Sequence, residues 1–210
     1  MENTASEVAK MLLEIYAIKL NVDEPFTWAS GWKSPIYCDN RLSLSYPEVR
    51  NSVKQKIVEA IKTNYPGVES IAGVATAGIP QGALTADALG LPFIYVRSKP
   101  KGHGMENMIE GKIVEGQKAV VIEDLVSTGG SSLNAVEALR ANNIEVLGMV
   151  SIFTYGFPVA DENFNKSNVN LISLSNYNEL VDVALKMNYI SEDQISHLKS
   201  WREAPEKWGK

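Results

Sequence analysis

The sequence predicts an α/β fold, a Rossmann-like and mostly parallel sheet flanked by helices. Two observations predict it. Short apolar runs of strand length, most of them rich in β-branched residues, occur at Ser70–Val74, Pro92–Val96, Ala119–Ile122 and Val146–Ile152. Segments with apolar residues at helical spacing separate these runs around Gln81–Leu89 and Leu133–Ala141. Such alternation favours βαβ units, whose strands run parallel.

The remaining elements follow from the same periodicities. Residues 5–18 carry apolar positions at helical spacing, and a second helix is expected to begin near residues 45–48, where Pro47 suits a first turn. Beyond Phe153 the pattern loosens. It predicts one more strand and two more helices, at Leu171–Leu174, Leu180–Met187 and Ser191–Trp201.

Composition sets limits on the class of protein. A chain of 210 residues without repeats or a linker-like tract is expected to form a single domain, residues 1–210. It contains neither an apolar run of roughly 18 residues nor a signal-peptide pattern, so we expect a cytoplasmic protein without a membrane partner. A net charge of −5 and a pI near 5.2 argue against nucleic acid as a partner. The single cysteine, Cys38, excludes an intrachain disulfide and is expected to be a packed residue.

The most informative stretch is residues 118–132, KAVVIEDLVSTGGSS. Glu123 and Asp124 follow an apolar strand, and ligands of open α/β sheets bind beyond the carboxyl ends of the strands. Residues 127–132 then offer hydroxyls and backbone N–H groups just before a helix, which is an arrangement that binds phosphate. Carboxylates for sugar hydroxyls, followed by amides for a phosphate, predict a ribose 5-phosphate site.

The order of these parts distinguishes the stretch from two other nucleotide motifs. In a dinucleotide-binding fold the glycines precede the ribose-binding acid, whereas here the acids come first, and no phosphate-binding loop ending in Gly-Lys-Ser/Thr occurs. An acid pair alone could be a polar strand end, and a Gly-Gly pair alone could be an ordinary turn. The complete string favours a ligand site.

Two further segments could hold anions. Arg97, Lys99, Lys101 and His103 fall within seven residues, among glycines and without apolar periodicity, so we expect a mobile basic loop that closes over a site. Its alternative is a solvated charged connection. Residues 75–80, ATAGIP, follow a predicted strand with small side chains that let backbone amides approach an anion, although they could also form a simple turn.

Residues 118–132 resemble the phosphoribosyl pyrophosphate (PRPP) motif of type I phosphoribosyltransferases. Three other segments, 26–41, 73–83 and 95–111, narrow the resemblance to the orotate phosphoribosyltransferases, and together it covers roughly residues 10–190. The resemblance implies the type I phosphoribosyltransferase fold, with a small N-terminal hood formed by about residues 1–40. It also implies a homodimer in which the basic loop is shared across subunits.

The activity implied by this resemblance is transfer of ribose 5-phosphate from PRPP to N1 of orotate, giving orotidine 5′-monophosphate and pyrophosphate in pyrimidine biosynthesis. Mg²⁺ is the implied cofactor, held mainly through PRPP and without a metal site of the protein's own. Two alternative functions remain, which differ from this activity in the base or in the class of protein. One is a phosphoribosyltransferase for another base, and the other is a PRPP-sensing regulator that binds nucleic acid.

The resemblance also assigns roles to residues. The implied catalytic residues are Arg97, Lys101, His103 and Asp124. The implied PRPP-binding residues are Arg97, Lys99, Lys101, His103, Glu123, Asp124, Leu125, Val126, Ser127, Thr128, Gly129, Gly130 and Ser131. The implied orotate-binding residues are Ser127, Phe26 and Lys33, with Phe26 or Trp28 able to stack on the ring. By position, the non-proline cis peptide that is frequent in this family would be Ala75–Thr76.

The chain departs from some bacterial members of the family at four positions where those members carry lysine or arginine, namely Ala29, Ala77, Ser98 and Tyr155. Those four roles are not carried over. A larger share of the positive charge at the site therefore falls to Arg97, Lys99 and Lys101.

Overall fold

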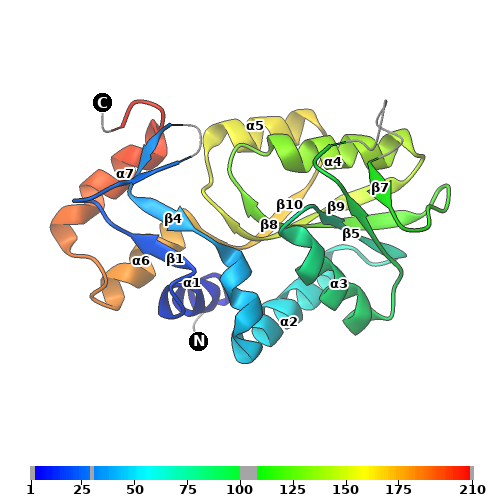
Figure 1. The fold of residues 1–210 in the computed structure, drawn as a ribbon, viewed down its shortest axis with the longest axis horizontal. Coiled ribbons are helices and arrows are strands. Elements are labelled where there is room, and N and C mark those ends of the chain that lie inside the picture. The colour runs from blue at the N-terminus through cyan, green and yellow to red at the C-terminus, as the bar shows by residue number, and fades with distance from the viewer. Residues whose placement is uncertain (1–2, 29–30, 100–107, 209–210) are drawn as a thin grey trace.

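The computed structural model describes residues 3–28, 31–99 and 108–208. Its centre is a six-stranded sheet in the order β10-β9-β8-β5-β6-β7, parallel except for the β6–β7 pair (Figure 1). In sheet order the strands are β10 (Leu171–Asn176), β9 (Glu145–Thr154), β8 (Lys118–Val126), β5 (Ser70–Val74), β6 (Phe93–Val96) and β7 (Ile109–Glu110). The predicted α/β fold with a mostly parallel sheet is confirmed.

Helices cover both faces of this sheet (Figure 1). One face carries α1 (Thr4–Glu14), α2 (Pro47–Asn64) and α3 (Gly78–Leu89), and the other carries α4 (Gly130–Ala141) and α5 (Pro158–Lys166). Alternate residues of β8 enter the two cores, because successive side chains of a strand point to opposite faces. Val120 and Ile122 join the core with α1 and α2, whereas Ala119 and Val121 join the core with α4.

The chain leaves the centre of the sheet in two directions. From β5 it proceeds outward to β6 and β7, and it then returns to β8 on the other side of β5 before continuing to β9 and β10. The reversal between β5 and β8 is a topological switch point, and the carboxyl ends of these two strands are where a doubly wound fold binds its ligand.

Close packing at this point depends on one glycine. A β-carbon on Gly78, at the start of α3, would lie 2.4 Å from the carbonyl oxygen of Ile122 in β8. Only glycine therefore lets the first turn of α3 approach the neighbouring strand this closely.

The N-terminal segment adds four short strands and a 3-10 helix. We call the strands the hood; they pair antiparallel, β1 with β4 and β2 with β3. Their bounds are β1 (Ile18–Leu20), β2 (Phe26–Thr27), β3 (Lys33–Ser34) and β4 (Ile36–Cys38), and η1 (Asn40–Ser45) follows. The helix predicted over residues 5–18 ends at Glu14, because Tyr16 adopts a left-handed backbone with φ 58° and the chain then enters β1.

The C-terminal segment continues from the edge strand β10. It forms α6 (Tyr177–Lys186), the 3-10 helix η3 (Glu192–Gln194) and α7 (Ile195–Glu203). Helix α7 lies on the same side of the molecule as the hood strands (Figure 1). One difference from the sequence prediction is β7, since residues 109–110 pair antiparallel with β6 where a continuing loop was expected. Within the part of the chain that the structure describes, no helix is long and apolar enough to cross a membrane.

Candidate active site

Two adjacent carboxylates lie where β8 loses one of its neighbours. Strand β8 pairs with β5 only as far as Ile122, while its pairing with β9 continues to Val126. Glu123 and Asp124 therefore lie inside the strand, rather than after its end, and just beyond its last pairing with β5. The open edge beside them is the entrance that the switch point provides.

Glu123 is the more enclosed of the two acids, with 5% of its surface exposed. One carboxylate oxygen accepts a hydrogen bond from the backbone N–H of Asp124 at 3.0 Å, and the other accepts one from Ser132 Oγ at 2.9 Å. Burial, and then the neighbouring charge of Asp124, raise the pKa of Glu123 to about 8. Glu123 therefore retains its proton at neutral pH.

Asp124 is held from the N-terminal side of the molecule. The side-chain amide of Asn40, itself buried, donates to the backbone carbonyl of Asp124 at 2.7 Å. Burial raises the pKa of Asp124, and the guanidinium of Arg41 acts in the opposite direction. The backbone is thus fixed by η1, while the carboxylate accepts hydrogen bonds from the Glu123 side chain and the Leu125 backbone.

The predicted phosphate-binding loop, residues 127–131, connects β8 to α4. Gly129 has φ 84° at the N-cap of α4, where no side chain caps the helix, and the preceding carbonyl of Thr128 accepts a hydrogen bond from the Asn163 side chain at 3.0 Å. A β-carbon at Gly129 would lie 2.7 Å from the ring of Phe164. The uncapped first turn of α4 directs backbone N–H groups towards the loop, which is the arrangement that binds a phosphate at a helix N-terminus.

The turn after β5 supplies a second helix N-terminus at the same edge. The Ala75–Thr76 peptide is cis, as predicted. Helix α3 begins directly afterwards, and Ala77 at its N-cap makes no side-chain hydrogen bond to the first turn. The two helix N-termini that follow β5 and β8 are the parts that the sequence predicted would hold anions.

The basic segment begins where β6 ends. The backbone N–H of Arg97 donates to the carbonyl of Met108 at 2.8 Å, and its guanidinium forms an ion pair with Glu110 at 3.3 Å. Lys99 is exposed. Lys101 and His103, the other two residues of the predicted basic cluster, lie outside the described residues.

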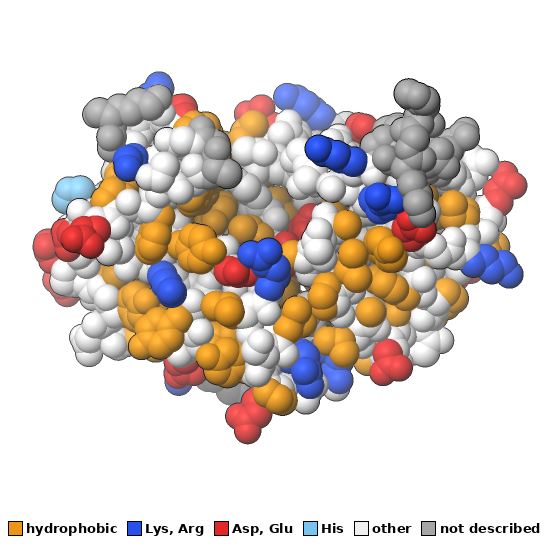
Figure 2. All heavy atoms as spheres, in the orientation of Figure 1, with side chains coloured by type: hydrophobic (Ala, Val, Ile, Leu, Met, Phe, Trp, Pro, Cys, Tyr) orange, Lys and Arg blue, Asp and Glu red, His pale blue; other side chains and the backbone are white. Residues whose placement is uncertain are grey.

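A cleft of about 320 Å³ opens beside the phosphate-binding loop. It is lined from the hood by Thr27, Trp28, Tyr37 and Cys38, and from the sheet by Leu125, Ser127 and Tyr155. Figure 2 shows this face hollowed between the hood and the sheet, with hydrophobic side chains on the hood side. Ser127 belongs both to this cleft and to the loop, so a ligand bound in one adjoins a ligand bound in the other.

The predicted base-binding residues do not all line this cleft. Ser127 and Trp28 line it. Phe26 instead packs on Tyr37, with ring centroids 5.7 Å apart, and Lys33 donates to the hydroxyl of Thr27 at 2.9 Å. Phe26 and Lys33 therefore contact residues that line the cleft without lining it themselves.

The walls of the cleft are mostly aromatic. The ring of Trp28 lies 5.1 Å from that of Tyr155, and its indole N–H donates to the carbonyl of Ile36 at 3.1 Å. Burial raises the pKa of the Tyr155 hydroxyl and of the Cys38 thiol, so both groups are neutral at neutral pH. Flat aromatic walls of this kind suit a planar ligand.

Sequence reasoning did not place Tyr37, Cys38 or Tyr155 in a base site. Tyr155 was noted only as a position where arginine is absent, although its place directly after a predicted strand was a usable signal. Tyr37 and Cys38 had a weaker signal, because the hood brings them to the sheet through tertiary packing alone.

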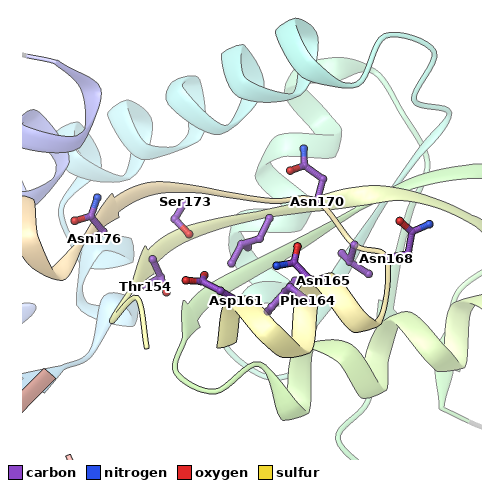
Figure 3. Close-up of a pocket in the computed structure, with 10 residues that line it drawn as sticks. Thr154, Asp161, Phe164, Asn165, Asn168, Asn170, Ser173 and Asn176 are labelled. Carbon is purple, nitrogen blue, oxygen red and sulfur yellow. The ribbon is translucent and has the colours of Figure 1, made fainter. Parts of the chain in front are cut away.

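A second cleft, of about 690 Å³, lies between α5 and β10 (Figure 3). Polar side chains from α5 and β10, among them Asp161, Asn165 and Ser173, point into it. It contains none of the predicted site residues. Among the described residues, no group of three or more His, Cys, Asp or Glu side chains is placed to hold a metal ion in either cleft.

Comparison with known proteins points to one family. Residues 45–188 match the model described as phosphoribosyl transferase domain. A protein named orotate phosphoribosyltransferase from Cytophaga hutchinsonii is 59% identical, over 99% of this chain and 100% of its own length. One of the same name from Porphyromonas gingivalis is 53% identical, over 100% of both chains. The solved structure of orotate phosphoribosyltransferase from Aeropyrum pernix superposes with a TM-score of 0.75 at 28% identity, covering 88% of this chain and 99% of that one.

Proposed function

Because the chain belongs to the phosphoribosyltransferase family, and within it to the orotate phosphoribosyltransferases, we propose that it transfers ribose 5-phosphate from PRPP to N1 of orotate, releasing pyrophosphate. The product is orotidine 5′-monophosphate, and the reaction is a step of pyrimidine biosynthesis. The observation that carries this proposal is the adjacency of two sites: Ser127 lines the aromatic cleft and also begins the phosphate-binding loop.

PRPP is placed along the carboxyl edge of β5 and β8. Its 5′-phosphate occupies the loop at residues 127–131, where the amides of α4 and the hydroxyls of Ser127, Thr128 and Ser131 surround it. Its ribose lies over Asp124, whose carboxylate accepts from the 2′- and 3′-hydroxyls. Leu125 and Val126 form the surface between the phosphate site and the ribose site.

Its diphosphate lies towards the turn after β5, at the N-terminus of α3. The basic segment supplies the cations, from Arg97, Lys99, Lys101 and His103. When diphosphate binds, Arg97 gives up its ion pair with Glu110 and pairs instead with the diphosphate, which carries more negative charge. A basic segment shared across a homodimer would complete this arrangement.

Mg²⁺ fits this donor set. Asp124 offers hard oxygen atoms, while both oxygens of Glu123 already accept hydrogen bonds, so the protein supplies too few ligands for a cage of its own. The ion is therefore held mainly by the diphosphate and the ribose hydroxyls. When bound, it supplies neutralisation of charge on the leaving diphosphate.

The orotate ring lies against Trp28 in the cleft, with its N1 atom directed at C1 of the ribose. Positive charge develops on the ribose ring as the bond to pyrophosphate breaks. The carboxylate of Asp124 stabilises that charge, and the cations of the basic segment stabilise the departing diphosphate. N1 of orotate attacks from the opposite side, so the configuration at C1 inverts without a covalent enzyme intermediate.

The proposal is tested by following the ultraviolet absorbance of orotate with protein, PRPP and Mg²⁺, omitting each component in turn. We expect orotate to be consumed only in the complete mixture. A panel of other bases serves as the control for specificity. Consumption of another base in place of orotate would contradict the proposed substrate, and PRPP binding without turnover of any base would contradict the enzymatic function.

The proposed cellular compartment is the cytoplasm.

A further inference from the structure

The C-terminal helix α7 lies behind the base cleft, although it falls outside the family match, which ends at residue 188. Its residue Trp201 is completely buried. The Trp201 ring packs edge-on against Trp28 at 5.5 Å and against Tyr155 at 5.6 Å. Both of those rings line the cleft, so Trp201 forms a second aromatic layer directly behind its wall.

The next residue, Arg202, holds the turn that carries Tyr155. Its guanidinium donates to the carbonyl of Gly156 at 2.7 Å and to the carbonyl of Tyr155 at 3.3 Å. Gly156 has φ 64°, and a β-carbon at this position would lie 3.3 Å from the guanidinium. The turn after β9 is thus shaped around the Arg202 side chain.

These contacts join three parts of the chain that are distant in sequence. Trp28 comes from the hood, Tyr155 follows β9, and Trp201 and Arg202 come from α7. Trp28 and Tyr155 pack on each other with ring centroids 5.1 Å apart and so form one aromatic wall of the cleft, and α7 contacts both residues from behind. The phosphate-binding loop has its own support, since the side chain of Asn163 in α5 donates to the carbonyl of Thr128.

We propose that α7 is a positioning element of the base cleft, in which Arg202 fixes the turn at Tyr155 and Trp201 supports the aromatic wall that Trp28 and Tyr155 form. The proposal rests on the proposed function, because it assigns α7 to the orotate side of the reaction. Neither residue touches the reacting atoms. Their loss weakens orotate binding and leaves PRPP binding intact.

The test is steady-state kinetics of Arg202→Ala, with the KM for orotate and the KM for PRPP measured separately. We expect the orotate KM to rise about tenfold, as for loss of a charge-assisted hydrogen bond, and the PRPP KM to stay within about twofold. Arg202→Lys keeps one donor and should recover part of the loss. Lys199→Ala, an exposed position on the same helix, is the matched control and should change neither KM.

Trp201→Phe is a second variant that keeps a buried ring, and it tests the same idea if Arg202→Ala does not fold. It should raise the orotate KM with an unchanged PRPP KM. An unchanged orotate KM in folded variants, or an equal rise in both KM values, would overturn the role of α7 while leaving the proposed function intact. Absence of orotate turnover by the unaltered protein would instead overturn the proposed function, and this inference with it.

Discussion

The PRPP side and the base side of the site are built in different ways. The PRPP side consists of two strand–turn–helix units that are each continuous in sequence, β5 with α3 and β8 with α4. The base side is assembled from the hood, the turn after β9 and, behind them, α7. Under the proposed function, the first binds through backbone N–H groups and carboxylates, and the second through aromatic surfaces held by tertiary packing.

This difference separates chemistry from selectivity. Charge develops on the PRPP side during transfer, so changes there should reduce turnover. The base side only positions the ring, so changes there should alter the KM for orotate. Each prediction below either breaks that separation or sharpens it.

The largest effect is expected for Asp124→Asn. It removes the negative charge that faces the ribose, and turnover should fall about 10²–10³-fold, as when one preorganised stabilising group is lost. The fold should persist, because the contact that docks Asp124 on Asn40 uses its backbone carbonyl. Circular dichroism and kcat measure the two outcomes, and a variant that unfolds would show that the carboxylate is structural.

A large effect on turnover is also expected for Lys101→Ala, a residue outside the described part of the chain. If its ammonium stabilises the leaving diphosphate, kcat should fall far more than PRPP affinity, by about 10²-fold. Lys112→Ala, exposed just after β7, is the control. An unaltered kcat in the Lys101 variant would contradict the assignment of the basic segment to the transition state.

A smaller and selective effect is expected for Trp28→Ala on the base side. Loss of one aromatic wall should raise the orotate KM about 3–10-fold, which is the usual contribution of a stacked ring pair. The PRPP KM should change little, because the contacts of Trp28 are with Tyr155, Trp201 and the carbonyl of Ile36. Equal effects on both substrates would remove the distinction between the two sides.

The smallest effect on catalysis is expected for Glu123→Gln. In the absence of ligands, this substitution should have a clear effect on stability instead. The pKa of Glu123 is raised to about 8 from its ordinary 4.5, so the folded chain retains a proton that the unfolded chain releases between these values. The stability contributed by this group is complete below the unfolded pKa and is lost as pH rises through the folded pKa.

Glutamine preserves the neutral form at every pH. Thermal unfolding from pH 5 to pH 9 should therefore show equal Tm values at the acid end and a Tm higher in the variant by roughly 5–10 °C at the alkaline end. Ser132→Ala, which removes one hydrogen-bond partner of Glu123 but not its charge, serves for comparison. A Tm difference independent of pH would mean that Glu123 is not protonated in the folded chain.

The two sides also differ in how far they can be predicted from sequence. The PRPP side was predictable because its residues are neighbours in the chain: residues 118–132 fixed the strand, the acids and the loop, and the cis peptide at Ala75–Thr76 is where the resemblance placed it. Only the extent of β8 was misjudged, since it pairs with β9 for four residues beyond its last pairing with β5.

On the base side, Trp28 and Ser127 line the cleft, whereas Phe26 contacts Tyr37 and Lys33 contacts Thr27, two residues that line it. The roles of these four residues in binding orotate stay predictions. Tyr155 lines the cleft, and α7 packs behind it against the turn after β9. Contacts between residues 28, 155 and 201 have no local pattern in sequence, so periodicity could not reveal them.

A crystal structure with orotidine 5′-monophosphate would test the joining of the two sides most directly. We expect the pyrimidine ring beside Trp28 and Tyr155, the ribose hydroxyls on Asp124 and the phosphate on residues 127–131. The product bound instead in the polar cleft between α5 and β10 (Figure 3) would contradict the account.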